Sequence, residues 1–289
     1  MDIQNLAAFL LVAETGSFSL AAETLHLTQP AVSKRVSLLE QQLAAELFDR
    51  IGRTVSLTES GKALLPHARA VQQALQAARQ SVRDLSGEVG GELRLATSHH
   101  IGLHRLPPVL SDFSQAYPGA HIDIDFMDSE QAYELILQGK AELAVVTLAP
   151  TRDAKLVTLP VWPDPLDFMV ARHHPLAGQR RLELATLSAY PAVLPGLNTY
   201  TGQIVARLFE QCRVDLQVSM ATNYLETIRM MASVGLGWTV LPRSMADDSL
   251  VTLQPNGAGI SRTLGIVYHQ GRSLSRAARA FIEVVRAAA

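Results

Sequence analysis

The sequence predicts a small helical domain, one long helix and then an α/β domain of two lobes. Three observations predict this architecture. Apolar residues recur at helical spacing over the first 43 residues, a heptad pattern follows over residues 64 to 85, and strands alternate with helices from Glu92 onward. A chain of 289 residues is long enough for each of these domains to have its own core.

Composition indicates an ordinary globular chain without a targeting segment. Hydrophobic residues make up 48% of the chain, and Cys212 is the single cysteine, so neither an internal disulfide nor a zinc cluster of cysteines is expected. The opening "MDIQNLAAFLLVAETG" has no basic lead-in and contains Glu14, which fits neither a signal peptide nor a membrane span. We therefore expect a cytoplasmic protein with no membrane partner.

Two helices are expected at the start of the chain. Asp2 can cap a first helix over roughly residues 3 to 14, with Gly16 in the left-handed position that follows it. Ser17 or Ser19 can cap a second, short helix at "LAAETL". The small alanines of this segment permit close approach of a neighbouring helix.

A third helix follows after a joint of three residues, His26-Leu27-Thr28. Thr28 is its expected cap, and Pro30 suits the first turn, where a missing N–H costs nothing. Its periodicity separates an apolar face from a polar one. The positions expected to face inward are Val32, Val36, Leu39 and Leu43, and those left outward are Gln29, Ser33, Lys34 and Ser37.

The outward face combines an amide, two hydroxyls and a cation at the N-terminal end of a helix. This chemistry reads base edges and contacts phosphates in the major groove, although a solvated face of a three-helix bundle would look similar. The following "LFDRIGRTVSLTESG" places Arg50 and Arg53 beside a short alternating strand, as a β-wing would. Residues 1 to 58 hold four basic and six acidic side chains, so only this local basic edge, which includes Lys34 and Arg35, favours DNA.

A heptad seam follows between Thr58 and about Ser86. A helix packed on its own domain would usually show a broader apolar stripe, so the narrow seam favours a dimerisation helix. Pro66 removes a helical hydrogen bond and should bend the first two turns, and "SGEVGG", residues 86 to 91, should be a flexible exit. The seam residues are Leu64, Ala68, Val71, Leu75, Ala78, Val82 and Leu85.

The last two-thirds of the chain alternates between strand and helix patterns. "ELRLAT", "HIDIDFM" and "AELAVVTL" are expected strands, with helices at "LPPVLSDFSQAY" and "SEQAYELILQG" between them. A break at "PVWPDPL", residues 160 to 166, should start a second series, and after Leu264 the chain should return to the first. This order predicts two α/β lobes crossed by two strands, with a cleft between them.

Hydroxyl and imidazole groups gather where strand ends and helix starts should border this cleft. Such ends favour an anion, although a single Ser or Thr there is more often a helix cap. No Arg or Lys lies in these stretches, so a highly charged ligand is not indicated. The candidate effector residues are Thr97, Ser98, His99 and His100 of "ATSHHIG", Thr147, and Asn198, Thr199 and Thr201 of "LNTYTGQI".

Metal-binding and enzymatic functions find little support in the sequence. His100 and His104 are four residues apart, but no acidic residue lies nearby in sequence to complete a zinc site. The chain contains no G-x-S-x-G, H-E-x-x-H, C-x-x-C, Walker or dinucleotide-binding motif. A solute-binding protein of a transporter would share the cleft but not the helical domain. We therefore expect no metal, no catalytic residue and no cofactor.

The whole chain resembles the LysR-type transcriptional regulators. "FLLVAETGSFSLAAETLHLTQPAVSKRVSLLEQQLAAELFDRIGRTVSLTESG" is similar to their N-terminal winged helix-turn-helix, residue type by residue type. The α/β part looks like their effector domain, which is similar to type 2 periplasmic binding proteins. One departure is Ala45, which stands where many members have Gly and puts the shape of the turn before the wing in question.

The resemblance implies a regulator that binds double-stranded promoter DNA as a dimer or a dimer of dimers, responds to a small-molecule effector and works with RNA polymerase. Implied domains are residues 1–58 for DNA binding, 59–90 for the linker and dimerisation, and 91–289 for the effector. Lobe I would comprise residues 91–162 and 266–289, and lobe II residues 163–265.

The resemblance also implies roles for individual residues. Ser98, His100, Thr147 and Thr201 match effector contacts of the family, most closely in its sulfur-assimilation members, where small oxyanions or sulfur metabolites bind. The implied DNA-binding residues are Thr28, Gln29, Pro30, Ser33, Lys34, Arg35, Ser37, Arg50 and Arg53.

Overall fold

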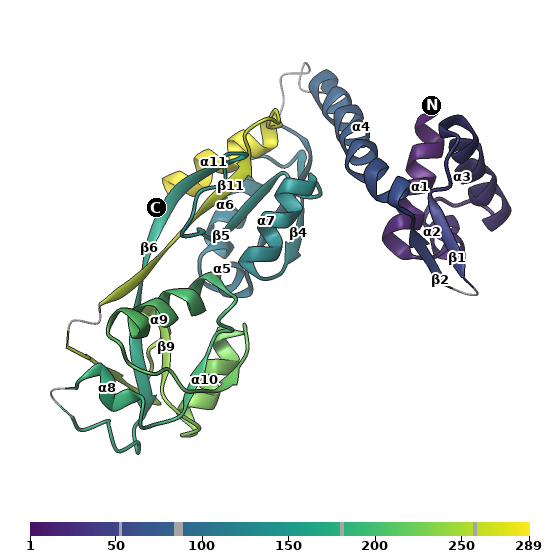
Figure 1. Cartoon of the computed structure of the whole chain (residues 1–289). Coiled ribbons are helices and arrows are strands. Elements are labelled where there is room, and N and C mark those ends of the chain that lie inside the picture. Colours follow the sequence, from purple (N-terminus) through teal and green to yellow (C-terminus); the bar gives the residue numbers. More distant parts are fainter. Residues whose placement is uncertain (52–53, 84–88, 180–181, 257–258) are drawn as a thin grey trace. The chain divides into compact units, whose positions relative to one another are not determined.

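The computed structural model describes residues 1–51, 54–83, 89–179, 182–256 and 259–289 (Figure 1). The chain divides into two compact units, Met1–Ser86 and Gly87–Ala289. The first unit is helical with a small hairpin, and the second contains a seven-stranded sheet. Among the described residues, no helix is long and apolar enough to cross a membrane.

The first two helices, α1 (Ile3–Thr15) and α2 (Phe18–Thr24), begin at the predicted caps. Asp2 Oδ1 accepts a hydrogen bond from the Gln4 N–H at 2.8 Å, and Gly16 ends α1 in the left-handed conformation with φ of 62°. Ser17 Oγ accepts from the Leu20 N–H at 3.3 Å. These caps let the chain turn within two residues, so that α1 and α2 both pack on the third helix.

The third helix, α3 (Gln29–Leu43), presents the two faces that its periodicity predicts. Val32, Val36 and Leu39 are fully buried in the core of the unit. Thr28 occupies the cap position, but its side chain accepts no hydrogen bond from the first turn. The helix start therefore depends on packing and on the fixed φ of Pro30 more than on its cap.

The end of α3 differs from the prediction. Leu43 was expected to face inward, and it is 40% exposed, so that prediction is wrong. The helix stops after Leu43 because Ala44 adopts the left-handed conformation with φ of 50°. Leu47 and Phe48, which follow this turn, fill the core in place of Leu43.

A hairpin and a long helix complete the first unit. Strands β1 (Phe48–Ile51) and β2 (Thr54–Leu57) pair antiparallel, as expected for a wing. Helix α4 (Glu59–Arg83) follows and continues through Pro66. Its N-terminal half packs on the core of its own unit through Leu64, Ala68 and Val71.

In the second unit, lobe I contains a parallel arrangement of three strands covered by helices. The central strand β3 (Gly91–Thr97) pairs with β4 (Ala120–Phe126) and β5 (Leu143–Thr147), as predicted. Alternate side chains of these strands point to opposite faces of the sheet, and each set packs against the helices on its own face. The lobe I helices are α5 (His99–His104), α6 (Leu106–Ala116), α7 (Ser129–Gln138) and α11 (Arg276–Ala287).

Two long antiparallel strands, β6 (Leu156–Ala171) and β11 (Ile260–His269), run from lobe I into lobe II (Figure 1). The predicted break at residues 160 to 166 is wrong, because β6 continues through it. Among the described residues, the part of β6 that holds Pro160, Pro163 and Pro165 pairs on one side alone, with β11. Prolines are tolerated at such an edge, since their missing N–H can face the unpaired side.

Lobe II surrounds the far half of β6. Strands β9 (Thr239–Pro242) and β10 (Leu250–Leu253) pair with β6, while β7 (Ala192–Leu194) and β8 (Val218–Ala221) form a separate parallel pair. In its core, Phe209 stacks on Trp238, and Phe168 packs against Trp238 at a tilt. Its helices are α8 (Leu184–Leu187), α9 (Tyr200–Gln211), α10 (Leu225–Ser233) and the 3₁₀ helix η2 (Arg243–Met245).

Candidate functional site

The outward face of α3 is the first candidate site. Gln29 and Lys34 are exposed near its N-terminal end, and Ser33 and Ser37 are half-buried beside them. Arg35 is partly engaged within the unit, since its guanidinium donates to Gln4 Oε1 at 2.8 Å. An amide, two hydroxyls and an ammonium group therefore lie together on one helix face.

The other predicted DNA-binding residues belong to the start of α3 and to the hairpin segment. Thr28 and Pro30 are exposed at the start of α3. Arg50 belongs to β1 of the hairpin. Arg53 lies outside the described residues, as does Leu85 of the seam.

The second candidate site is a cavity between lobe I and lobe II. Its volume is about 50 Å³, which is room for roughly three to five waters. It brings together six of the eight predicted effector residues, which come from the first turn of α5, the end of β5 and the first turn of α9. These six are Ser98, His99, His100, Thr147, Thr199 and Thr201.

The remaining two predicted effector residues do not line the cavity. Thr97 is fully buried in β3, and its hydroxyl donates to the Val145 carbonyl at 2.7 Å, which ties β3 to β5. Asn198 is exposed outside the lining of the cavity. Thr199 lines the cavity but also caps α9, because its Oγ1 accepts from the Gly202 N–H.

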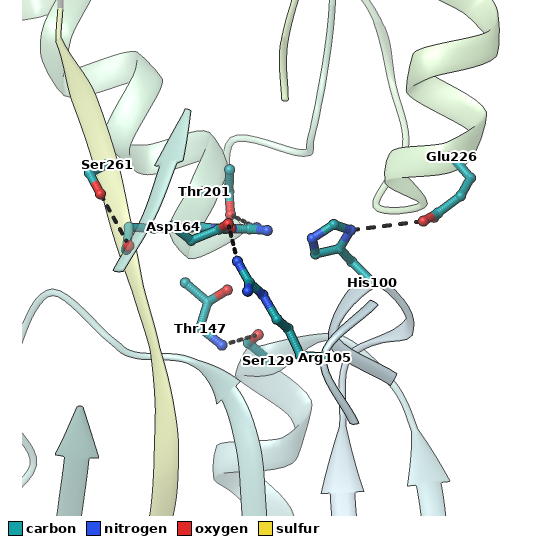
Figure 2. Close-up of polar contacts among 9 residues, drawn as sticks. His100, Arg105, Ser129, Thr147, Asp164, Thr201, Glu226 and Ser261 are labelled. Carbon is teal, nitrogen blue, oxygen red and sulfur yellow. Dashed lines mark hydrogen bonds and ion pairs between the residues drawn. The ribbon is translucent and has the colours of Figure 1, made fainter. Parts of the chain in front are cut away.

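Arg262 of β11 lies in the cavity wall and was missed by the sequence analysis. It is 6% exposed, and its Nε donates to Asp164 Oδ2 at 2.8 Å while its Nη1 donates to Thr201 Oγ1 at 2.8 Å. Arg105 adds a second cation at 3.7 Å from Asp164 Oδ1, and Figure 2 shows it pointing toward that carboxylate. Arg262 Nη2 has no acceptor among the described residues.

The charge around Arg262 favours an anion. Burial lowers the pKa of Arg262, and the Asp164 carboxylate opposes that shift; an arginine keeps its proton in proteins. Two guanidinium groups share one buried carboxylate, so this end of the cavity carries a net positive charge. The sequence analysis found no Arg or Lys in the candidate stretches and therefore did not indicate a highly charged ligand; the cation in the cavity wall, Arg262, comes from a strand distant in sequence.

Two hydrogen bonds connect the lobes across the other wall of the cavity. Asn223 Nδ2 of lobe II donates to Asp128 Oδ2 of lobe I at 2.6 Å. The Tyr200 N–H at the start of α9 donates to Glu130 Oε1 of α7. Burial raises the pKa of Glu130, and the hydrogen bond from Tyr200 opposes this shift. Both acidic residues thus already have donors, and they hold the lobes together over the cavity.

A third contact between the lobes involves two histidines of α5. His104 Nε2 lies 2.9 Å from Glu226 Oε1 of α10, and His100 Nδ1 lies 3.8 Å from the same oxygen. Burial, the Arg262 charge and His104 together lower the pKa of His100 to about 3. His100 is therefore a neutral imidazole at physiological pH. Glu226, which follows His104 by 122 residues, is the acidic neighbour that sequence spacing did not reveal.

The comparisons with known proteins agree with this architecture. The family model "Bacterial regulatory helix-turn-helix protein, lysR family" matches residues 3–62, and "LysR substrate binding domain" matches residues 86–289. The chain belongs to the LysR family of transcriptional regulators. The expectations of a regulator rather than an enzyme, and of this fold class, are thereby confirmed.

Individual relatives of this LysR-family chain match it over almost its full length. The RuBisCO operon transcriptional regulator of Allochromatium vinosum is 30% identical over 99% of this chain and 95% of its own length. A full-length OxyR variant from Pseudomonas aeruginosa has a TM-score of 0.75 at 22% identity, covering 99% and 95% of the two chains. CbnR in complex with its target DNA has a TM-score of 0.69 at 22% identity, covering both chains fully.

Proposed function

We propose that this LysR-family regulator binds promoter DNA in a sequence-specific manner through α3 and the β1–β2 hairpin, and that a small oxyanion-bearing molecule in the cavity modulates this binding. Inorganic oxyanions and sulfur metabolites are the ligand classes that we favour. The observation that carries the ligand class is Arg262, a buried cation with a free N–H at a cavity that both lobes line.

The assignment of DNA binding rests on the polar face of α3. Gln29 has the amide that pairs bidentately with adenine, and Lys34 has the ammonium group that contacts phosphate. The structural neighbour CbnR has been solved on its target DNA, which agrees with this use of the fold. We assign residues 1–58 to DNA binding, 59–90 to dimerisation and 91–289 to the effector, with RNA polymerase as a further partner.

The response to an effector follows from the contacts between the lobes. A cavity of about 50 Å³ accepts a small anion, whereas a larger metabolite requires the lobes to separate. Separation would break the Asn223–Asp128 and Tyr200–Glu130 hydrogen bonds. A ligand that prefers one lobe arrangement shifts the population toward it, and it can alter DNA binding only through that difference in affinity.

The ligand class can be tested by thermal denaturation of the full chain with sulfate, sulfite and O-acetylserine. One of these should raise the Tm in a saturable manner, because a ligand that binds the folded state stabilises it. Arg262→Lys should weaken that response at least about 10-fold, since lysine keeps the charge but lacks the planar fork. The exposed Arg243→Lys is the matched control. No response from any of the three, or an unchanged response in Arg262→Lys, would refute the oxyanion assignment.

A further inference from the structure

His100, His104 and Glu226 form a cluster of metal-ligating groups at the boundary of the two lobes. One ligand atom from each lies within 4.8 Å of the other two. The histidines are four residues apart on α5, so their rings lie on one helix face with centroids 4.7 Å apart. Glu226 lies in the first turn of α10 in lobe II.

His100 supplies a second, independent observation. It is 4% exposed, and neither ring nitrogen has a hydrogen-bond partner among the described residues. A buried polar group without a partner costs free energy, so a ligand for it is expected. Figure 2 shows the ring between Glu226 and Thr201, with one nitrogen directed at the Glu226 carboxylate and the other toward the opposite side.

We propose that His100, His104 and Glu226 bind a divalent transition-metal ion of the Zn²⁺ type, and that this ion links lobe I to lobe II. Membership of the LysR family does not require such a metal site, and the metal site does not depend on the proposed effector.

The spacing of the ligand atoms suits this ion. Tetrahedral Zn²⁺ has bonds of about 2.0–2.1 Å to imidazole and carboxylate, which separates its ligand atoms by roughly 3.3 Å. The observed separations from Glu226 Oε1 are 2.9 Å to His104 and 3.8 Å to His100. Small side-chain movements would bring all three atoms to bonding distance.

The protonation states also suit a metal. A metal ligand must be a neutral imidazole or an ionised carboxylate. Burial, Arg262 and His104 hold the pKa of His100 far below its ordinary value, which leaves its ring unprotonated. Burial acts to raise the pKa of Glu226, but the hydrogen bonds to its carboxylate and the two neighbouring histidines together outweigh burial and lower that pKa.

The ligand set discriminates among metal classes. Two imidazoles and one carboxylate favour Zn²⁺, Ni²⁺, Co²⁺ or Fe²⁺ over Mg²⁺ or Ca²⁺, which prefer oxygen ligands alone. Three protein ligands leave a fourth position for water. The side chains of His104 and Glu226 are 45% and 34% exposed, so an ion can reach the site from solvent.

The test uses the full chain, without a histidine tag and stripped of metal with a chelator, and Co²⁺ as the probe. We expect one Co²⁺ per chain, visible absorption bands of a four- or five-coordinate ion, and displacement by Zn²⁺. His104→Ala and Glu226→Gln should each weaken binding at least about 100-fold, because loss of even an outer-shell partner costs 10- to 100-fold. Zn²⁺ should raise the Tm of the wild-type chain but not of these variants.

Two control variants isolate the site. His121→Ala removes an exposed histidine of lobe I outside the cluster, and Cys212→Ser removes the exposed thiol; both should bind Co²⁺ as the wild type does. Wild-type affinity in His104→Ala or Glu226→Gln, or no stoichiometric Co²⁺ binding by the wild type, would overturn the proposal. The assay contains neither DNA nor an anionic effector, so its failure would leave the proposed function standing.

Discussion

The two units of this regulator assemble their candidate sites in opposite ways. In the first unit, the proposed DNA-binding residues all fall between Thr28 and Arg53, and one helix carries most of them. In the second unit, Arg262 meets Asp164 and Thr201 across 98 and 61 residues of chain, and Glu226 meets His104 across 122. A site made from one helix can be predicted from periodicity, whereas a site made at the junction of two lobes requires the fold.

The difference extends to burial. The first site is a solvated surface, on which a single side chain can change without disturbing the core. The second contains a buried ion pair that also supports the fold, with Asp164 1% exposed. Substitutions at the second site should therefore change the stability of the fold strongly, whereas substitutions at the first site should change DNA binding with little effect on stability.

The largest effect is expected for Arg262→Ala. Among the described residues, it leaves the buried Asp164 carboxylate with only the more distant Arg105 as an ion-pair partner, and loss of one partner of a buried pair costs about 3–5 kcal/mol. Both tryptophans of the chain, Trp162 and Trp238, lie in the second unit, so fluorescence during urea denaturation measures the free energy of unfolding of that unit.

The matched control is Arg243→Ala, which removes an exposed two-bond ion pair with Asp167. Arg243 is largely exposed to solvent, so loss of this pair should lower the unfolding midpoint much less than loss of the buried Arg262 pair. Equal destabilisation by the two substitutions would show that the Arg262 pair has no special role in the fold.

A smaller effect, on assembly, is expected along α4. Its first half packs on its own unit, while Val82 is 69% exposed and Leu75 half-buried. We expect the second half to pair two chains, so that Leu75→Asp and Val82→Asp raise the dimer dissociation constant at least about 100-fold through burial of uncompensated charge. Analytical ultracentrifugation measures this constant, and a dimer that survives both changes would refute the seam.

Ala68 provides the contrast within the same helix. It is 1% exposed in the core of its own chain, so Ala68→Asp should unfold the first unit rather than produce folded monomers. Circular dichroism distinguishes these outcomes.

On α3, Gln29→Ala should reduce discrimination at one base pair by about 1–3 kcal/mol. Lys34→Ala should instead weaken binding to every sequence and reduce the slope of log affinity against log salt by about 0.9 per lost phosphate contact. Anisotropy titrations on specific and scrambled duplexes at several salt concentrations separate the two. If both variants lowered specific and non-specific affinity equally, the base-reading role of Gln29 would be wrong.

The smallest effect is expected at the turn after α3. Ala44 has φ of 50°, a conformation that costs an L-residue roughly 1–2 kcal/mol. Glycine removes this strain, but its greater conformational entropy in the unfolded chain destabilises the fold by about 0.4–1 kcal/mol. Ala44→Gly should therefore stabilise the first unit by about 0.5 kcal/mol. Ala45→Gly, at a residue without positive φ, should slightly destabilise it. The reverse order in thermal denaturation would contradict this account of the turn.

These contrasts explain what the sequence could and could not predict. The caps at Asp2 and Ser17 and the buried face of α3 depend on neighbours within four residues, so periodicity and residue type identified them. The sequence predicts a break within β6 because three prolines in seven residues are typical of a loop. The structure tolerates them because this part of β6 pairs on one side alone, with β11. The alanine at position 45, where many family members have glycine, indicated that this turn is unusual. The residue with the strained backbone, however, is Ala44.

The cleft was predicted in part for the same reason. Ser98, His100, Thr147 and Thr201 are local to strand ends or helix starts, which the alternating pattern locates. Arg262 lies in β11 and Glu226 in α10, where a charged residue is ordinarily interpreted as a solvated position. No local signal distinguishes them from surface residues; the crossing of β11 and the closure of the lobes place them in the cavity wall and at the His100–His104 cluster.

The most direct test of the account is fluorescence anisotropy of the full chain on the DNA upstream of its own gene, against a scrambled duplex. Sulfate, sulfite or O-acetylserine would be added at constant ionic strength. We predict salt-dependent preference for the upstream DNA, and that one compound changes that affinity at least about 5-fold, the lower range of allosteric coupling, in the wild type but not in Arg262→Lys. Identical binding to both duplexes, or an equal response in Arg262→Lys, would contradict it.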